Sequence, residues 1–128
     1  PRVLALAHIS RVNVELEFIK KVVKAMESKR ARAGGIEVYI GPTISKESFL
    51  MDYFDDDKRA KWQSFAALHP SGKIALDLSG YAVNQLKEVG VREENIKLSG
   101  VDTCTTDEYF SYYRDSRAGK KRGGLPRL

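Results

Sequence analysis

Few side chains in this 128-residue sequence have the chemistry of a catalytic or metal-binding group. The only histidines are His8 and His69, and the only cysteine is Cys104. A neutral imidazole can bind a metal ion or exchange a proton, and a thiolate can bind a metal ion or act as a nucleophile. The sequence contains no glycine-rich phosphate loop and no GxSxG or HExxH motif. Any chemistry therefore depends on which residues the fold brings together.

The sequence positions of His8 and Cys104 each allow two interpretations. His8 follows the apolar run 3–7, which predicts a short buried strand. Since sites gather at strand ends in α/β folds, His8 is a candidate catalytic residue, and a structural histidine is the alternative. His69 lies in a predicted turn, where a structural role is expected. Cys104 precedes a predicted helix at 105–112, whose N-terminus would favour the thiolate, and a buried, inert thiol is the alternative.

The densest aromatic cluster is the segment 109–115, which reads Tyr-Phe-Ser-Tyr-Tyr-Arg-Asp. Aromatic rings next to a cation can stack a nucleobase. The alternative is a helix that packs its rings into the core.

Strands and helices must position these residues, and the apolar patterns predict where they lie. Strands are predicted at 3–7, 36–40, 74–76 and 96–98, and helices at 14–30, 45–51, 58–68, from Asp77 or Ser79 to Gly90, and at 105–112. The apolar stripe of the first helix consists of Phe18, Ile19, Val22, Val23 and Met26. A strand, a helix and a strand in this order suggest a crossover unit, although a mixed sheet fits as well. The predicted fold class is α/β, with a mixed β-sheet flanked by helices.

Composition narrows the class of protein further. The chain is 42% hydrophobic and 30% charged, as expected for one globular domain, and no apolar run is long enough for a membrane span. A single cysteine excludes an internal disulfide, so the reducing cytoplasm is the expected compartment.

The formal net charge is +5, and residues 116–128 contain five basic residues and no acid. We therefore divide the chain into an α/β domain at 1–115 and a basic tail at 116–128, which is a solvated tail, a phosphate-binding loop or a nucleic-acid arm.

Several short motifs resemble, in order and spacing, the laccase-domain family, also called YfiH-like or multicopper polyphenol oxidoreductase proteins. They are Ile40-Gly41-Pro42-Thr43-Ile44-Ser45, Leu76-Asp77-Leu78, Asn84-Gln85-Leu86, Cys104-Thr105, Phe110-Ser111-Tyr112 and Arg114-Asp115. The corresponding family motifs are G-P-C-I, H-L-D-L, N-x-x-Q-L, C-T and F-F-S-Y-R-R-D, preceded by H-A-G-W-R-G. The resemblance runs from about Val3 to Lys120. It corresponds to the C-terminal half of the family domain and implies a YfiH-like fold.

This resemblance also implies a site. Family members are described as purine nucleoside phosphorylases with adenosine deaminase activity, or as copper-dependent phenol oxidases, with a His/Cys/His centre usually taken as zinc. The first histidine falls on His8, the cysteine on Thr43 and the second histidine on Ala75. A threonine hydroxyl is a far poorer zinc ligand than a thiolate, and alanine has no ligand atom. The resemblance therefore implies a degenerate metal site with no cofactor, unless another segment completes it for zinc or copper.

The C-terminal motif is better matched. Ser111, Tyr112, Arg114 and Asp115 fall on family positions. Of these, Ser111, Tyr112 and Arg114 are the expected substrate-binding residues, and His8 is the expected catalytic residue. The Trp-Arg-Gly of the first family motif falls on residues 11–13, which read Arg-Val-Asn.

Three hypotheses follow from the sequence. The first is a divergent laccase-domain homologue without the metal-dependent chemistry, which keeps a pocket for a purine nucleoside or phosphate. The second is an active purine nucleoside phosphorylase or adenosine deaminase, in which His69 or another chain assists His8. The third is a nucleic-acid-associated domain that uses the basic tail, and it ranks last. The expected partners are a purine nucleoside or phosphate and an N-terminal-half segment or second chain, with no membrane.

Overall fold

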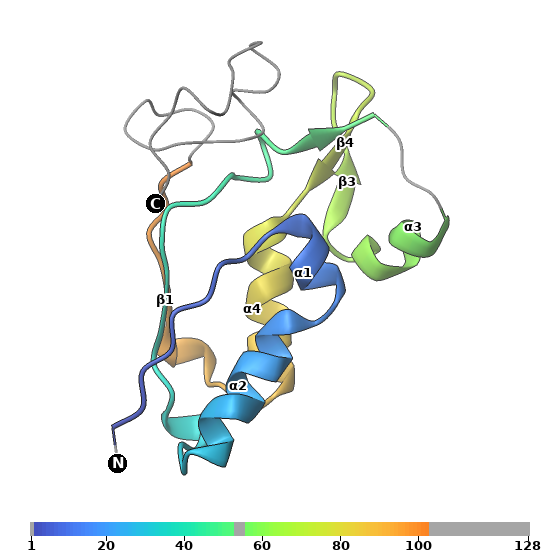
Figure 1. Ribbon diagram of the computed structural model, residues 1–128. Helices are drawn as coiled ribbons and strands as arrows, with labels where there is room; N and C mark the ends of the chain where they lie inside the picture. The colour runs from blue at the N-terminus through green and yellow to red at the C-terminus, as the bar shows by residue number, and fades with distance from the viewer. Residues whose placement is uncertain (1, 53–55, 103–128) are drawn as a thin grey trace, which may run out of the picture.

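The computed structural model describes residues 2–52 and 56–102, and Figure 1 shows how its elements are arranged. Along the chain they are α1 (Arg11–Glu15), α2 (Phe18–Ser28), η1 (Ala33–Gly35), β1 (Val38–Ile40), β2 (Leu50–Met51), α3 (Asp56–Trp62), β3 (Ala66–Leu68), β4 (Ile74–Leu76), α4 (Leu78–Glu88), η2 (Glu93–Asn95) and β5 (Ile96–Leu98). The predicted α/β class is confirmed.

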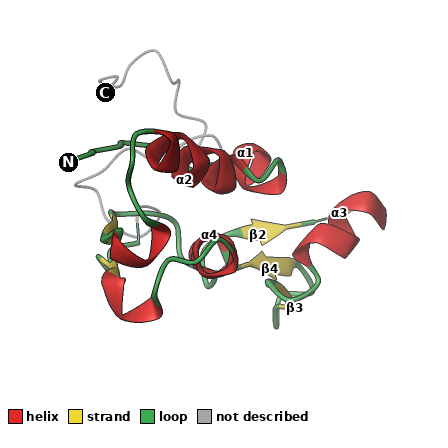
Figure 2. Cartoon of the chain, turned by 90° about the horizontal axis from the view of Figure 1, so that it is seen from below, coloured by secondary structure: helices red, strands yellow, loops and turns green. Residues whose placement is uncertain are grey.

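The described strands form two sheets, of which one is parallel and the other antiparallel. β1 and β5 pair in parallel, with Val38 opposite Ile96 and Ile40 opposite Leu98. β4 lies between β2 and β3 and is antiparallel to both. Figure 2 shows α4 end-on between the two sheets, with α1 and α2 forming a layer on one side of it. α4 is therefore the central element of the described fold.

The core gathers around α4, with which both α1 and α2 are in contact. Its apolar residues come from all parts of the described chain: Val14, Ile19, Val23, Ile36, Ile44, Phe49, Trp62, Leu76, Leu78, Ala82, Leu86 and Val91. Trp62 and Tyr81 meet edge to face with ring centroids 4.9 Å apart, and Phe65 stacks on Tyr81 at 4.8 Å. Such contacts add specific geometry to the general gain from burying apolar area.

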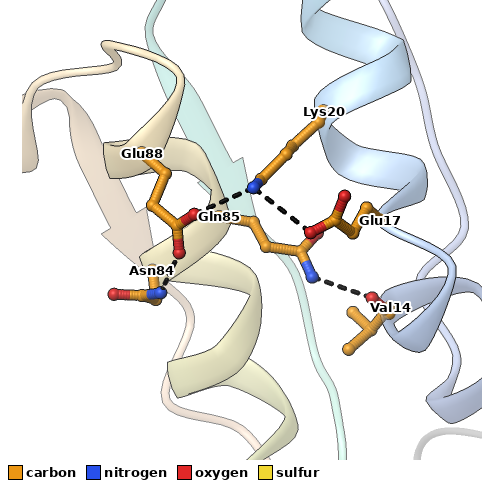
Figure 3. Close-up of polar contacts among 6 residues, drawn as sticks. All are labelled: Val14, Glu17, Lys20, Asn84, Gln85 and Glu88. Atoms are coloured by element: carbon orange, nitrogen blue, oxygen red, sulfur yellow. Dashed lines mark hydrogen bonds and ion pairs between the residues drawn. The ribbon is translucent and has the colours of Figure 1, made fainter. Parts of the chain in front are cut away.

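α2 and α4 are also joined by polar contacts, which Figure 3 shows in close-up. Lys20 Nζ lies 2.8 Å from Glu88 Oε2 and 3.3 Å from Glu17 Oε1. The hydrogen bond to Glu88 raises the pKa of Lys20, and Glu17 adds to this effect. Beneath this network, the buried Gln85 donates from Nε2 to the carbonyl oxygen of Val14 at 2.8 Å. This side chain therefore fixes α1 against α4.

Two sequence predictions for the first thirty residues are wrong. Residues 3–7 form no strand, and Leu4 and Leu6 are fully exposed, because no strand in the described part of the chain pairs with them. The predicted helix at 14–30 is divided into α1 and α2 by Glu17, whose φ of 57° is left-handed. Tertiary contacts explain this break: α1 is held by Gln85 and by Trp62 Nε1, which donates to Glu15 at 2.8 Å.

Two further helices are shorter than predicted or missing. Residues 45–51 form a turn followed by β2, because the Ser45 hydroxyl donates to Asp102 rather than capping a helix. The predicted helix at 58–68 ends as α3 at Trp62, and residues 66–68 are β3 instead, since they pair with β4.

Other predictions are confirmed. β1, β4 and β5 lie within the predicted strands, and Asp77 caps α4 by accepting from the amide of Gly80 at 3.0 Å. Gly90 has a φ of +99°, as expected for a helix end. No helix among residues 2–52 and 56–102 is long and apolar enough to cross a membrane. The predicted helix at 105–112 and the tail at 116–128 lie outside the described residues.

Candidate functional site

A small pocket lies where the two parallel strands end. Since β1 and β5 run in the same direction, their carboxyl ends lie at the same edge. Pairing continues past the strands: the Ser99 amide donates to Ile40 O at 2.9 Å, and the Thr43 amide donates to Val101 O at 3.1 Å. Ligands of open α/β sheets bind at this position, outside the carboxyl ends of the strands.

The pocket has a volume of about 110 Å³. It is lined by Ile40, Gly41, Thr43, Ser45, Ser79, Leu98, Ser99, Gly100, Val101 and Asp102. Ser79 comes from the first turn of α4, and the other residues follow or end β1 and β5. The lining thus combines apolar side chains with hydroxyls and one described carboxylate, around a space about the size of a sugar ring rather than of a whole drug-like molecule.

Among the described residues of this lining, Asp102 is the only ionisable one. Its Oδ2 atom accepts from Ser45 Oγ at 2.6 Å and from Ser48 Oγ at 2.5 Å. An ionised carboxylate has about four acceptor positions, which allows it to accept from several hydroxyl groups at once. The two serines orient the carboxylate, and the backbone bridge between Thr43 and Asp102 holds it at the end of the sheet.

The positions that the sequence analysis compared with metal ligands are not brought together in one pocket. Thr43 lines the pocket at the sheet edge, but His8 and Ala75 do not. His8 is exposed just before α1, and its carbonyl oxygen accepts from Asn13 Nδ2 at 2.7 Å. Ala75 is the middle residue of β4, between Leu50 and Ala67. The catalytic role of His8 stays a prediction.

His69 has a structural position in the hairpin between β3 and β4. Its Nδ1 atom accepts from the Ser71 amide at 3.1 Å and lies 2.8 Å from the Ser71 hydroxyl. Cys104, Ser111, Tyr112, Arg114 and Asp115 lie outside the described residues, so their predicted roles stay predictions.

The donor set of the pocket does not fit a copper or zinc centre. Copper and zinc sites in proteins use thiolate, imidazole and, for zinc, carboxylate ligands, whereas the described lining residues offer hydroxyls and one carboxylate. Within the described ranges, no three His, Cys, Asp or Glu side chains come together. The described residues therefore provide no basis for a step that uses a metal ion.

Sequence reasoning missed Asp102 and the serines around it. The signal was present, because Ser99-Gly100-Val101-Asp102 directly follows the predicted strand at 96–98. Polar residues just past a strand are expected at the sheet edge where sites gather. What the sequence did not show is that β5 pairs with β1, which brings Asp102 to Thr43 and Ser45.

Comparisons with known proteins agree with this fold. The family model described as multi-copper polyphenol oxidoreductase laccase matches residues 1–125, and the chain belongs to this family. The crystal structure of the Bacillus licheniformis hypothetical protein YfiH is similar, with a TM-score of 0.63 and 19% sequence identity. The similarity covers 80% of this chain and 41% of that one, so the chain spans less than half of its structural relative. No curated protein matches the sequence.

Proposed function

We propose that this chain is a divergent laccase-domain protein that binds a purine nucleoside through its sugar and has no metal-dependent activity. The observation that carries the proposal is the pocket at the ends of β1 and β5, in which Asp102 and several hydroxyls lie among apolar side chains. A carboxylate that accepts from vicinal sugar hydroxyls is a common way to hold a ribose. The single cysteine keeps the cytoplasm as the expected compartment.

The charge of the pocket favours a nucleoside over a phosphate. Asp102 supplies a carboxylate, and the lining residues that the structure describes include no Lys or Arg. A phosphate in this space would be repelled by the carboxylate, whereas a neutral sugar would donate to it.

The shape of the pocket suggests where the base lies. Its volume of about 110 Å³ suits a sugar-sized group but not a whole nucleoside. Leu98 and Val101 line the pocket and are exposed. A purine ring can cover these apolar side chains, which removes apolar area from water.

Titration calorimetry with inosine tests the proposal. We expect inosine and free ribose to bind and inorganic phosphate to give no signal. Asp102→Asn should weaken inosine binding about 10-fold, because a charge-assisted hydrogen bond is stronger than a neutral one. Asp52→Asn is the matched control, since Asp52 pairs with Lys73 at 3.4 Å and is not part of the pocket lining.

Two results would contradict the proposal. One is the absence of inosine binding to the wild-type chain. The other is equal affinity in Asp102→Asn and the wild type, with both variants folded by circular dichroism. Chromatography of a mixture of inosine, phosphate and protein should show no free base, and base release abolished by His8→Ala would support the active-enzyme alternative instead.

A further inference from the structure

One hydroxyl of the pocket comes from a different element than the others. Ser79 lies in the first turn of α4 and lines the pocket, whereas the other lining residues end or follow β1 and β5. The Ser79 side chain is half-buried, and among the described residues its hydroxyl has no hydrogen-bond partner. A hydroxyl that is partly removed from water is stabilised when a ligand supplies the missing partner.

The other hydroxyls of the lining have partners or lie at the end of the pocket that holds the carboxylate. Ser45 Oγ donates to Asp102 at 2.6 Å, and Ser99 Oγ accepts from a backbone amide at 3.2 Å. Thr43 forms a backbone bridge with Asp102 and therefore belongs to the same end of the sheet. Ser79 is thus the hydroxyl that the α4 wall contributes.

The proposed ligand has one polar group that is still without a partner. A ribose carries its 2′- and 3′-hydroxyls side by side and its 5′-hydroxyl on a separate methylene arm. In the proposed binding mode, Asp102 accepts from the vicinal pair, and the base covers Leu98 and Val101. The 5′-hydroxyl remains, and it requires a partner because a polar group that loses water without replacement is costly.

We propose that Ser79 binds the 5′-hydroxyl and is the residue that selects nucleosides in which this hydroxyl is unmodified. The inference rests on the proposed function, because it concerns the same pocket. A serine hydroxyl can donate one hydrogen bond and accept others, as can a sugar hydroxyl, so the two groups match without any charge.

The surroundings of Ser79 do not suit a 5′-phosphate. Phosphates bind at free helix N-termini, but Asp77 already caps α4, and its carboxylate accepts from the Gly80 amide at 3.0 Å. The described lining supplies Asp102 as well and includes no Lys or Arg. Both carboxylates would repel a phosphate, so nucleoside 5′-phosphates should be rejected.

Titration calorimetry with inosine, 5′-deoxyinosine and inosine 5′-monophosphate tests this selection. The wild type should bind inosine about 3–10-fold more tightly than 5′-deoxyinosine, as expected for one neutral hydrogen bond. It should bind the 5′-monophosphate at least about 10-fold more weakly than inosine, because the phosphate meets carboxylates and no described cation.

Variants of Ser79 assign the effect to its hydroxyl. Ser79→Ala should weaken inosine binding about 3–10-fold and leave the affinity for 5′-deoxyinosine unchanged, because that ligand lacks the partner hydroxyl. Ser79→Thr keeps a hydroxyl and should restore the preference for inosine. Ser28→Ala is the matched control: Ser28 lies on α2 outside the pocket lining and donates to Ala25 O at 2.6 Å, so this variant should bind like the wild type.

Three results would overturn the role of Ser79. They are equal affinities of the wild type for inosine and 5′-deoxyinosine, an equal loss for both ligands in Ser79→Ala, and binding of the 5′-monophosphate as tight as that of inosine. The proposed function would survive each of them if Asp102→Asn still weakened inosine binding, whereas no inosine binding to the wild type would overturn both. The comparison of ligands on the wild type needs no variant, and circular dichroism checks that the variants fold.

Discussion

At the scale of single residues, Asp102 connects the two halves of the pocket. It lies opposite Thr43 at the end of the parallel sheet and accepts hydrogen bonds from Ser45 and Ser48. The segment 43–48 is thereby tied to the end of β5. Under the proposed function, these contacts hold the carboxylate in position before a ligand binds.

Gly100 lies two residues before Asp102, and a substitution at Gly100 should lower the stability of the fold. Its φ of +73° is left-handed, and an added Cβ would meet no atom within 4 Å. Gly100→Ala should therefore destabilise the fold by about 1–2 kcal/mol through backbone strain alone. Chemical denaturation measures this value.

Gly35→Ala is the control for that prediction. Gly35 also has open space around its missing Cβ, but its φ is not left-handed. Its free energy of unfolding should change by less than about 0.5 kcal/mol, as is usual for surface substitutions. Equal losses for the two glycine variants would show that strain at Gly100 is not the cause.

At the scale of elements, β4 is the strand on which the three-stranded sheet depends. It pairs with β2 on one side and β3 on the other, and its Leu76 is fully buried in the core. Leu76 also begins the motif that leads into α4 through the Asp77 cap. This strand therefore joins the sheet to the central helix.

Leu76→Ala should destabilise the protein by about 2–5 kcal/mol, because a buried leucine loses its apolar contacts and leaves a cavity. Leu68→Ala, on the exposed position of neighbouring β3, should change the free energy of unfolding by less than about 0.5 kcal/mol. Denaturant titrations of the two variants give the comparison. Similar losses would mean that the sheet does not pack on the core as described.

At the scale of the whole molecule, two ionisable groups predict how stability depends on pH. The hydrogen bond to Glu88 raises the pKa of Lys20, and burial raises the pKa of Tyr81. Both groups therefore hold a proton more tightly in the folded state than in the unfolded state. Their contribution to stability is fully present below about pH 10 and is lost as the pH rises through the folded-state values.

Thermal unfolding at pH 8 and pH 11 measures this loss. The wild type should lose more stability between these values than the double variant Lys20→Met/Tyr81→Phe, which lacks both protons. Lys20 should account for at most about 1 kcal/mol of the stability lost between the two pH values, because its ion pairs are partly exposed. If the wild type and the variant lose the same amount, other groups determine the alkaline limit.

The sequence alone was sufficient to predict those helices and strands that have strong local signals. α4 has both a capping aspartate and a terminating Gly90, and β4 is a short apolar run that follows a turn. The split between α1 and α2 has no such signal, since neither Gly nor Pro interrupts the pattern. It depends on Gln85 and Trp62, which contact α1 from far along the chain.

The candidate site could be predicted only in part for the same reason. Thr43 was identified through its motif, and the structure places it in the pocket. Asp102 becomes part of that pocket only because β5 pairs with β1, over a separation of more than fifty residues. Likewise, residues 3–7 have the pattern of a buried strand, but a strand requires a partner that local sequence does not specify.

The most direct test of the central claim is the metal content of the purified chain after incubation with Zn²⁺ or Cu²⁺ and removal of the excess, measured by elemental mass spectrometry. The described lining of the pocket offers hydroxyls and a single carboxylate, and His8 is not part of it, so we expect no stoichiometric metal. One bound metal ion per chain, lost in the variant His8→Ala, would contradict the proposed loss of the family's metal centre.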